Sequence, residues 1–274
     1  MTTRLLRRNI KILVINPNSS EDMTRGMEKA IQGMPLHDAD LSFLFRLAQS
    51  LEIHTYTAPS GSPASINDDT DIKLSTEVVL KDLASSEELE KFDGVLVACY
   101  SVHTLVEKLS QQYHASLAVT GIFEASVLTA TSLLPQISSG SASSKWGVVT
   151  TGDFWEKHLS DGVNGYLGQA VQTDNTKFGG VMTTGLTAGD FHHVSPAEVK
   201  VKLEQATKRL LASGDVGCVV MGCAGMAGLE EIIRDSATEV YGKEKGSRIF
   251  IVDGVKAGIL QLEQAIRSRR LFHS

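Results

Sequence analysis

Two stretches of the sequence indicate the fold class, GVLVACYSVHTLVEKL at residues 94–109 and CVVMGCAGMAGLEEI at residues 218–232. Each stretch begins with a short apolar run rich in β-branched residues, reaches a cysteine (Cys99 or Cys223) and continues into a segment with helical spacing. Near-continuous apolar runs are typical of parallel strands that are covered on both faces. The two stretches therefore predict two strand–cysteine–helix units within a parallel α/β protein.

The sequence around these units repeats in the same order. A strand that ends in small polar residues precedes each unit, KILVINPNSS at 11–20 and KWGVVTTGD at 145–153. A strand and a helix follow each unit, LAVTGIFEASVLTATSL at 117–133 and FIVDGVKAGILQLEQA at 250–265. This order predicts two related α/β halves. We place the first half at residues 1–115 plus 246–274 and the second at residues 116–245.

Further strands and helices follow from hydrophobic periodicity. The predicted strands are Ile10–Ile15, Leu41–Leu47, Gly94–Ala98, Leu117–Ile122, Trp146–Thr150, Gly217–Met221 and Ile249–Val252. The predicted helices are Glu21–Ile31, Ile72–Leu83, Val102–Leu109, Glu124–Leu134, Pro196–Leu211 and Val255–Ile266. Segments 58–67 and 136–144 are rich in Gly and Ser and indicate loops.

Composition excludes several classes of function. The chain has 274 residues, 42% of them hydrophobic and 21% charged, which is typical of a globular protein. A net charge of −6 argues against a nucleic-acid partner, since phosphate binding needs a basic surface. No apolar run is long enough to span a membrane, and the first residues lack a secretory pattern. Three cysteines without CxxC spacing fit a reducing compartment, so we expect a cytoplasmic protein.

Cys99 and Cys223 are the candidate reactive residues. Each is predicted at a strand end where a helix begins, and a helix N-terminus lowers the pKa of a thiol. Cys218 lies inside a predicted strand and is interpreted as a small core residue. Two thiols that face one ligand suit a racemase, because one removes a proton from carbon and the other returns a proton to the opposite face.

Other chemistries have weaker support in the sequence. A Cys–His–Asp hydrolase would have to use His103, for which we also consider a place on the helix surface. His192 and His193 are adjacent, so on a strand they would point to opposite faces and do not suggest a metal site. No nucleotide-binding motif is present. The sequence thus predicts no metal and no cofactor.

The motifs resemble the hydantoin and allantoin racemases of the aspartate/glutamate racemase superfamily. The segments that carry the resemblance are KILVINPNSSEDMT at 11–24, GSPASI at 61–66, ACYS at 98–101, VTGIFEA at 119–125, GCAGM at 222–226 and VDGVKA at 252–257. The form of ACYSVH and the Gly/Ser insertion are more similar to fungal members. The resemblance implies two pseudo-symmetric halves, each with a four-stranded parallel sheet flanked by helices, and an active site in the cleft between them.

The resemblance also implies residue roles. Cys99 and Cys223 would be the two bases of a cofactor-independent racemase that acts on a cyclic ureide, with allantoin the leading candidate. Backbone N–H groups near Tyr100–Ser101 and Ala224–Gly225 would hold ring carbonyl oxygens. The residues expected to line the ring are Asn16, Ser65, Ile66, Thr150 and Thr151. A homo-oligomer is expected as well.

Two departures from the family leave alternatives open. Ser101, Val102 and His103 stand where bacterial relatives carry a Gly-Asp-Pro type sequence, which alters one wall of the pocket. Ala224–Gly225 stands where aspartate and glutamate racemases carry Thr-His, which favours a cyclic ureide over a free amino acid. The alternatives are a maleate-isomerase-like or decarboxylase-like enzyme on the same scaffold, and a non-catalytic ureide-binding protein.

Overall fold

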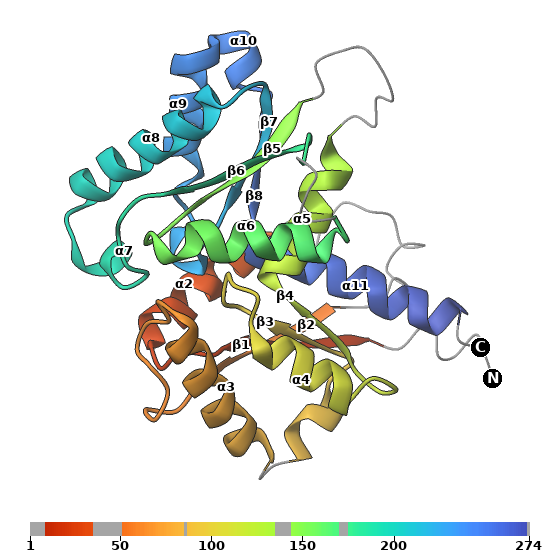
Figure 1. Cartoon of the computed structure of the whole chain (residues 1–274). Helices are drawn as coiled ribbons and strands as arrows, with labels where there is room; N and C mark the ends of the chain where they lie inside the picture. The colour runs from red at the N-terminus through yellow and green to blue at the C-terminus, as the bar shows by residue number, and fades with distance from the viewer. Residues whose placement is uncertain (1–8, 35–50, 85–86, 135–143, 170–174, 273–274) are drawn as a thin grey trace.

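Two parallel four-stranded sheets form the core of the protein (Figure 1). The computed structural model describes residues 9–34, 51–84, 87–134, 144–169 and 175–272. The first sheet has the order β2-β1-β3-β4 and the second the order β6-β5-β7-β8. The strands are β1 (Ile10–Asn16), β2 (Leu51–Thr57), β3 (Gly94–Val97), β4 (Ala118–Gly121), β5 (Lys145–Thr150), β6 (Phe178–Thr183), β7 (Val216–Met221) and β8 (Phe250–Asp253). Equal strand orders confirm the predicted fold of two related halves.

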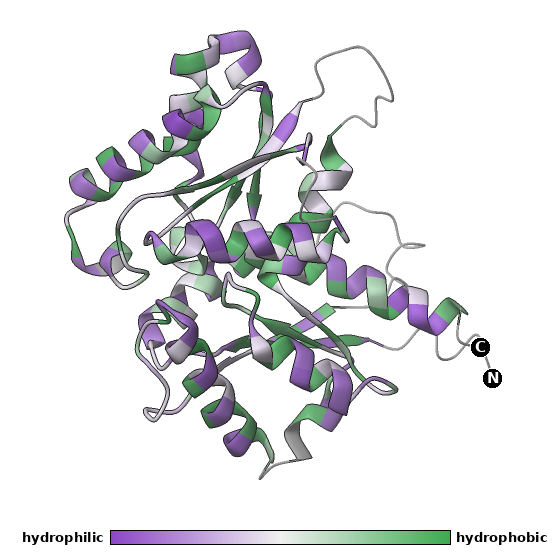
Figure 2. Cartoon of the chain, viewed as in Figure 1, coloured by the Kyte–Doolittle hydropathy of each residue, from purple (hydrophilic) through white to green (hydrophobic). Residues whose placement is uncertain are grey.

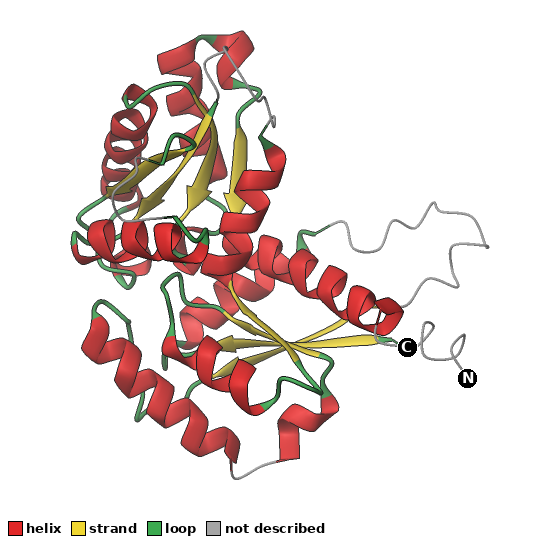
Figure 3. Ribbon diagram, turned by 45° about the vertical axis from the view of Figure 1, so that its right-hand side comes forward, coloured by secondary structure: helices red, strands yellow, loops and turns green. Residues whose placement is uncertain are grey.

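Helices cover both faces of each sheet (Figure 3). The α-helices are α2 (Glu21–Gln32), α3 (Asp69–Ala84), α4 (Thr104–Gln112), α5 (Ile122–Leu133), α6 (Phe154–Tyr166), α7 (Asp190–His193), α8 (Pro196–Ala212), α9 (Glu230–Tyr241), α10 (Lys243–Gly246) and α11 (Gly254–Phe272). Two 3₁₀ helices, η2 (Glu87–Lys91) and η3 (Ala224–Met226), complete the described elements. Hydrophobic residues gather on the strands, while α3 and α8 carry many polar residues (Figure 2). In the described part of the chain, no helix combines the length and apolarity that crossing a membrane requires.

Helices α5 and α11 exchange sheets. Helix α5 directly follows β4 of the first sheet but contacts β7 and β8 of the second. Helix α11 directly follows β8 of the second sheet but contacts β1, β3 and β4 of the first. The two helices also pack against each other, and one hydrophobic cluster runs through both sheets. This exchange joins the two halves through a shared core.

The strands and helices predicted within the described residues are all present, with ends that shift by a few residues. The predicted strand Leu41–Leu47 and most of the loop 136–144 lie outside the described residues. Strands β2 and β6 and helices α6 and α9 were not predicted. The sequence of β6, FGGVMT, contains two glycines, and strand propensity disfavours glycine.

The predicted boundaries of the two halves need correction. They place residues 116–121 in the second half and residues 246–253 in the first, whereas β4 pairs with β3 and β8 pairs with β7. The error arises because each strand and the helix that follows it were kept together, although they pack on different sheets. We propose units of residues 9–121 with 254–272, and of residues 122–253.

The contact between α11 and the first sheet depends on the absence of a side chain at Gly258. A Cβ there would overlap the buried side chain of Leu96 on β3. We expect Gly258→Ala to destabilise the protein by about 1–3 kcal/mol, since overpacking outweighs the better helix propensity of alanine. Gly26 of α2 is the matched control, because a Cβ there meets open space.

Urea unfolding measures both variants. Gly26→Ala should raise the free energy of unfolding by up to about 1 kcal/mol, because only the helix propensity changes. Equal stabilisation by both substitutions would contradict the described packing of α11 on β3.

Candidate active site

The carboxyl-terminal edges of the two sheets meet at a pocket of about 380 Å³, a volume that includes the solvent at its open mouth. Loops that follow β1, β3, β5 and β7 contribute to its wall. The lining residues are Asn18, Met23, Ile66, Ala98, Cys99, Tyr100, Thr151, Trp155, Ala188, Gly222, Cys223, Ala224 and Gly225. The edge where parallel strands end is the usual binding site of an open α/β sheet. Cys99 and Cys223 therefore line one small-molecule pocket from opposite halves of the protein.

Cys99 lies in the turn between β3 and α4. Its side chain is partly exposed, and its sulfur accepts a hydrogen bond from the Ser101 hydroxyl at 3.4 Å. The backbone carbonyl of Cys99 accepts from the Ser101 N–H at 3.0 Å, which fixes the turn. Helix α4 begins only at Thr104, so Cys99 does not sit at a helix N-terminus as predicted.

Cys223 caps the short helix η3. Its sulfur accepts a hydrogen bond from the Gly225 N–H at 3.4 Å. Its side chain is partly exposed, as is that of Cys99. Cys223 was predicted to begin a helix, and it does precede a helix, but this helix is the short 3₁₀ helix η3. The longer helix α9 begins only at Glu230.

Burial controls the acidity of both thiols. It raises the pKa of Cys99 to about 12 and that of Cys223 to about 11, in each case as the largest effect. The negative charges of Cys223, Asp71 and Glu124 raise the pKa of Cys99 further, whereas its hydrogen bond from Ser101 lowers it. The prediction of lowered thiol pKa values is therefore wrong for the free protein, because desolvation outweighs the hydrogen bonds.

Of the other predicted site residues, Ile66, Tyr100, Thr151, Ala224 and Gly225 line the pocket. Tyr100 is buried and packs edge-on against Phe123, with 5.7 Å between ring centroids. Asn16, Ser65, Ser101 and Thr150 are not among the lining residues, and each makes a contact elsewhere. Ser65 donates to the side chain of Asn67 at 3.1 Å, and Ser101 contacts the pocket through Cys99.

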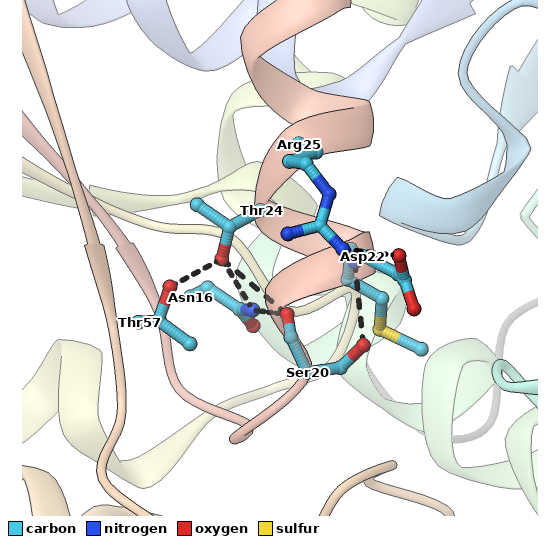
Figure 4. A network of polar contacts seen from close by, with 7 residues as sticks. Asn16, Ser20, Asp22, Thr24, Arg25 and Thr57 are labelled. Carbon is cyan, nitrogen blue, oxygen red and sulfur yellow. Dashed lines mark hydrogen bonds and ion pairs between the residues drawn. The ribbon is translucent and has the colours of Figure 1, made fainter.

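Asn16 organises the loop after β1 instead of lining the pocket (Figure 4). Its side-chain N–H group donates to the Ser20 carbonyl and to the Thr24 hydroxyl, both at 3.0 Å. Its side-chain oxygen accepts from the Asn18 N–H at 3.2 Å. Asn16 is fully buried, whereas Asn18 reaches the pocket. The Asn-Pro-Asn turn thus supplies its second asparagine to the site.

Thr150 holds the second cysteine loop in place. Its hydroxyl donates to the Gly222 carbonyl at 2.6 Å. Gly222 lies so close that a Cβ there would be 2.6 Å from a methyl group of Val148 and 2.8 Å from the Thr150 Cβ. A glycine before Cys223 is therefore required by the close approach of β5.

His103 is a buried structural residue. Its Nδ1 accepts the Leu105 N–H at 3.2 Å and caps α4, and its Nε2 lies 3.2 Å from the Ser75 hydroxyl. Burial, with a smaller effect of His158, lowers its pKa to about 3, so the ring is neutral. It neither lines the pocket nor lies on the surface, in contrast to both interpretations of the sequence.

No group of metal-binding side chains was found among the described residues. His193 is exposed on α7, and the side chain of His192 lies outside the described set.

Several lining residues were not assigned from the sequence, among them Met23, Trp155 and Ala188. Trp155 belongs to the unpredicted helix α6, and its ring packs edge-on against Phe154 and His158. It is buried and lines the pocket. The helical spacing of Trp155, Leu159 and Val163 after the strand KWGVVT is the signal that could have identified it.

Glu124 is a buried carboxyl group near the first cysteine. It stands three residues after the N-cap Gly121 of α5, and its carboxylate oxygen Oε2 is buried without a hydrogen-bond partner among the described residues. Burial raises its pKa to about 7. The sequence motif GIFEA contains this residue, but nothing in the motif alone indicates its burial.

Comparison with known proteins identifies the family and the fold of the chain. The family model described as Asp/Glu/Hydantoin racemase matches residues 12–262. Hydantoin racemase from Pseudomonas sp. (strain NS671) is 28% identical over 255 residues, covering 91% of this chain and 83% of that protein. An uncharacterised protein of Schizosaccharomyces pombe is 30% identical over 258 residues, covering 94% and 92% respectively. The crystal structure of allantoin racemase from Pseudomonas fluorescens shares the fold, with a TM-score of 0.70 at 22% identity, and covers 94% of this chain and 92% of that one.

The buried neutral state of His103 makes stability depend on pH. The pKa of His103 is about 3 in the folded protein, against 6.5 for an unperturbed histidine. The unfolded chain therefore binds the proton first, and stability is lost as the pH falls from about 6.5 towards 3. His103→Asn keeps an N-cap acceptor but removes this titration. We expect the variant to lose stability at pH 7.5 and to lose clearly less at pH 5, as measured by urea unfolding. An equal loss at both pH values would contradict the buried neutral ring.

Proposed function

The chain belongs to the Asp/Glu/hydantoin racemase family, and we propose that it is a cofactor-independent racemase of 5-substituted hydantoins, with allantoin as the leading candidate. The observation that carries the proposal is the placement of Cys99 and Cys223 in one pocket, one from each pseudo-symmetric half. The enzyme is thus an isomerase. Family resemblance extends the proposal to a cytoplasmic homo-oligomer in purine and nitrogen catabolism.

The reaction inverts a carbon next to a carbonyl group. The thiolate of one cysteine removes the C5 proton and becomes a thiol, while the electron pair of the C–H bond moves into an enolate. The thiol of the other cysteine then gives its proton to the opposite face of C5 and becomes the thiolate. The pocket would hold one sulfur on each side of C5, so neither proton transfer has to wait for a base or an acid to diffuse to the substrate. Positioning of this kind supplies a large part of the rate enhancement of an enzyme.

The similar acidity of the two thiols supports reversible transfer. The pKa values of Cys99 and Cys223, about 12 and about 11, are raised by the same cause and lie close together. A proton that leaves one thiol and reaches the other through the substrate therefore changes little in free energy. The raised pKa makes each thiolate a stronger base but also a rarer state near neutral pH, so the reaction needs groups that favour the thiolate.

Backbone groups beside the cysteines would hold the enolate oxygen. The N–H groups of Ser101 and Gly225 already donate to the Cys99 carbonyl and the Cys223 sulfur, so these two do not serve that role in the free protein. We therefore assign the role to the backbone N–H groups of Tyr100 and Ala224, because both residues line the pocket. Ile66 and Trp155 would pack against the flat ring.

Circular dichroism of a single enantiomer tests the function. We expect the purified protein to abolish the signal of (R)- or (S)-allantoin, or of another 5-substituted hydantoin, while mass spectrometry shows an unchanged mass. Racemisation leaves composition unaltered, whereas an isomerase of another kind, a hydrolase or a decarboxylase forms a different compound. Saturable binding without any loss of signal would indicate a binding protein and would remove the proposal.

Substitution of each cysteine separates the two bases. We expect Cys99→Ser and Cys223→Ser each to lower racemisation by at least a thousandfold, because a hydroxyl is a far weaker base than a thiol. Each variant keeps one base, so each should still exchange the C5 hydrogen of one enantiomer with solvent deuterium. The preferred enantiomers should be opposite, as measured by NMR in deuterium oxide.

Cys218→Ser is the matched control for these variants. Cys218 is fully buried within β7 and does not line the pocket. The control should cost stability and leave the rate per folded molecule unchanged. Full racemisation by both single variants of the pocket cysteines would exclude the two-base mechanism.

A further inference from the structure

The two pocket thiols are held by different donors at equivalent positions. In each half, the donor belongs to the second residue after the cysteine. In the first half the hydroxyl group of Ser101 donates to the Cys99 sulfur, and in the second half the backbone N–H of Gly225 donates to the Cys223 sulfur, both at 3.4 Å. The repeat thus conserves the place of the donor but not its chemistry.

We propose that Ser101 is a positioning residue that stabilises the thiolate of Cys99 through its side chain, so that one of the two bases depends on a removable hydroxyl while the other depends on the backbone. The part of the proposal that concerns thiol reactivity is independent of the reaction. Its consequence for turnover rests on the proposed racemase function.

Among the described residues, the surroundings of Ser101 offer no other role for its hydroxyl group than the contact with Cys99. The residue is fully buried, and its own N–H is engaged by the Cys99 carbonyl at 3.0 Å. That bond holds the backbone of the turn, which keeps the hydroxyl within reach of the sulfur. Ser101 is not among the residues that line the pocket, so a direct contact with substrate does not account for it.

The surrounding charges make this hydroxyl important. Among the described groups that act on the Cys99 sulfur, Cys223, Asp71 and Glu124 are anionic when ionised and disfavour a thiolate, and burial disfavours it as well. His103 is buried and neutral, so it supplies no positive charge. The Ser101 hydrogen bond is the interaction that opposes these effects at Cys99.

Alkylation of the individual cysteines tests the proposal. The rate of reaction with iodoacetamide is measured at fixed pH for Cys99, Cys223 and Cys218 by peptide mass spectrometry, in the wild-type protein and in Ser101→Ala. Loss of a hydrogen bond to a charged group lowers the thiolate fraction by about tenfold. Because a thiolate of higher pKa is also more nucleophilic, the rate at Cys99 should fall about threefold. The rate at Cys223 should not change.

Three further variants keep the test decisive. Ser101→Thr retains the hydroxyl and should restore the wild-type rate at Cys99, whereas Ser101→Gly should repeat the loss if Ser101→Ala does not fold. Ser236→Ala removes a buried serine that donates within α9, at 2.8 Å to Ile232, and should leave both pocket cysteines unchanged. An unaltered rate at Cys99 in the hydroxyl-free variants, or an equal loss in Ser101→Thr, would overturn the proposal.

Turnover separates this proposal from the racemase function. Since enantiomers have equal free energies, Ser101→Ala should lower kcat/KM by the same factor in both directions, up to about tenfold, while kcat and KM change differently for the two enantiomers. If Ser101→Ala loses Cys99 alkylation threefold while the wild-type protein racemises no hydantoin, the role of Ser101 is supported and the racemase function is rejected. If Ser101→Ala keeps the wild-type rate of Cys99 alkylation and the wild-type protein racemises the substrate, the role of Ser101 is rejected and the racemase function is supported.

Discussion

The exchange of helices between the two sheets is the constraint on which the site depends. Helix α5 follows a strand of the first sheet and covers the second, and α11 does the reverse. A Cβ on Gly254 would lie 3.2 Å from the Cβ of Ile122, so α11 begins in close contact with α5. Because both helices start where their strands end, this contact brings the carboxyl-terminal edges of the sheets towards each other. A parallel sheet alone would offer one cysteine, whereas the exchange gives a pocket with two.

Burial at that edge decides the chemistry of the thiols. A cysteine at the N-terminus of a long helix would be acidic and nucleophilic. Cys99 lies in a turn before α4 and Cys223 caps only η3, so neither receives the full effect of a helix N-terminus. Desolvation therefore dominates and raises the pKa of both. The thiolates of such cysteines are poor leaving groups and strong bases, which suits proton transfer at carbon better than it suits covalent catalysis.

The sequence predicted the architecture better than the details of the pocket. The repeated order of strand, cysteine and helix sufficed for two related α/β halves. The family resemblance implied four strands in each sheet, although hydrophobic periodicity did not predict β2 and β6. Residues such as Asn16 and Thr150 were assigned to the pocket since they follow strands, yet both turn inwards and hold backbone groups of neighbouring loops. Trp155 was missed because no helix was predicted there, although Trp155, Leu159 and Val163 have the i, i+4, i+8 spacing of a buried helix face. Thr150 points to the carbonyl of Gly222, 72 residues away, and a contact between such distant segments leaves no local pattern in the sequence.

Unequal support of the two bases is compatible with a symmetric reaction. Enantiomers are equally stable, so kcat/KM must be equal in the two directions whatever groups surround each sulfur. A donor that favours the Cys99 thiolate changes which protonation state the free enzyme prefers. The two enantiomers can therefore have different kcat and different KM values, while the ratio kcat/KM stays the same for both. The reaction thus requires two bases at equivalent positions but does not require equivalent donors. A hydroxyl of Ser101 in one half and a backbone amide of Gly225 in the other can therefore serve one pseudo-symmetric site.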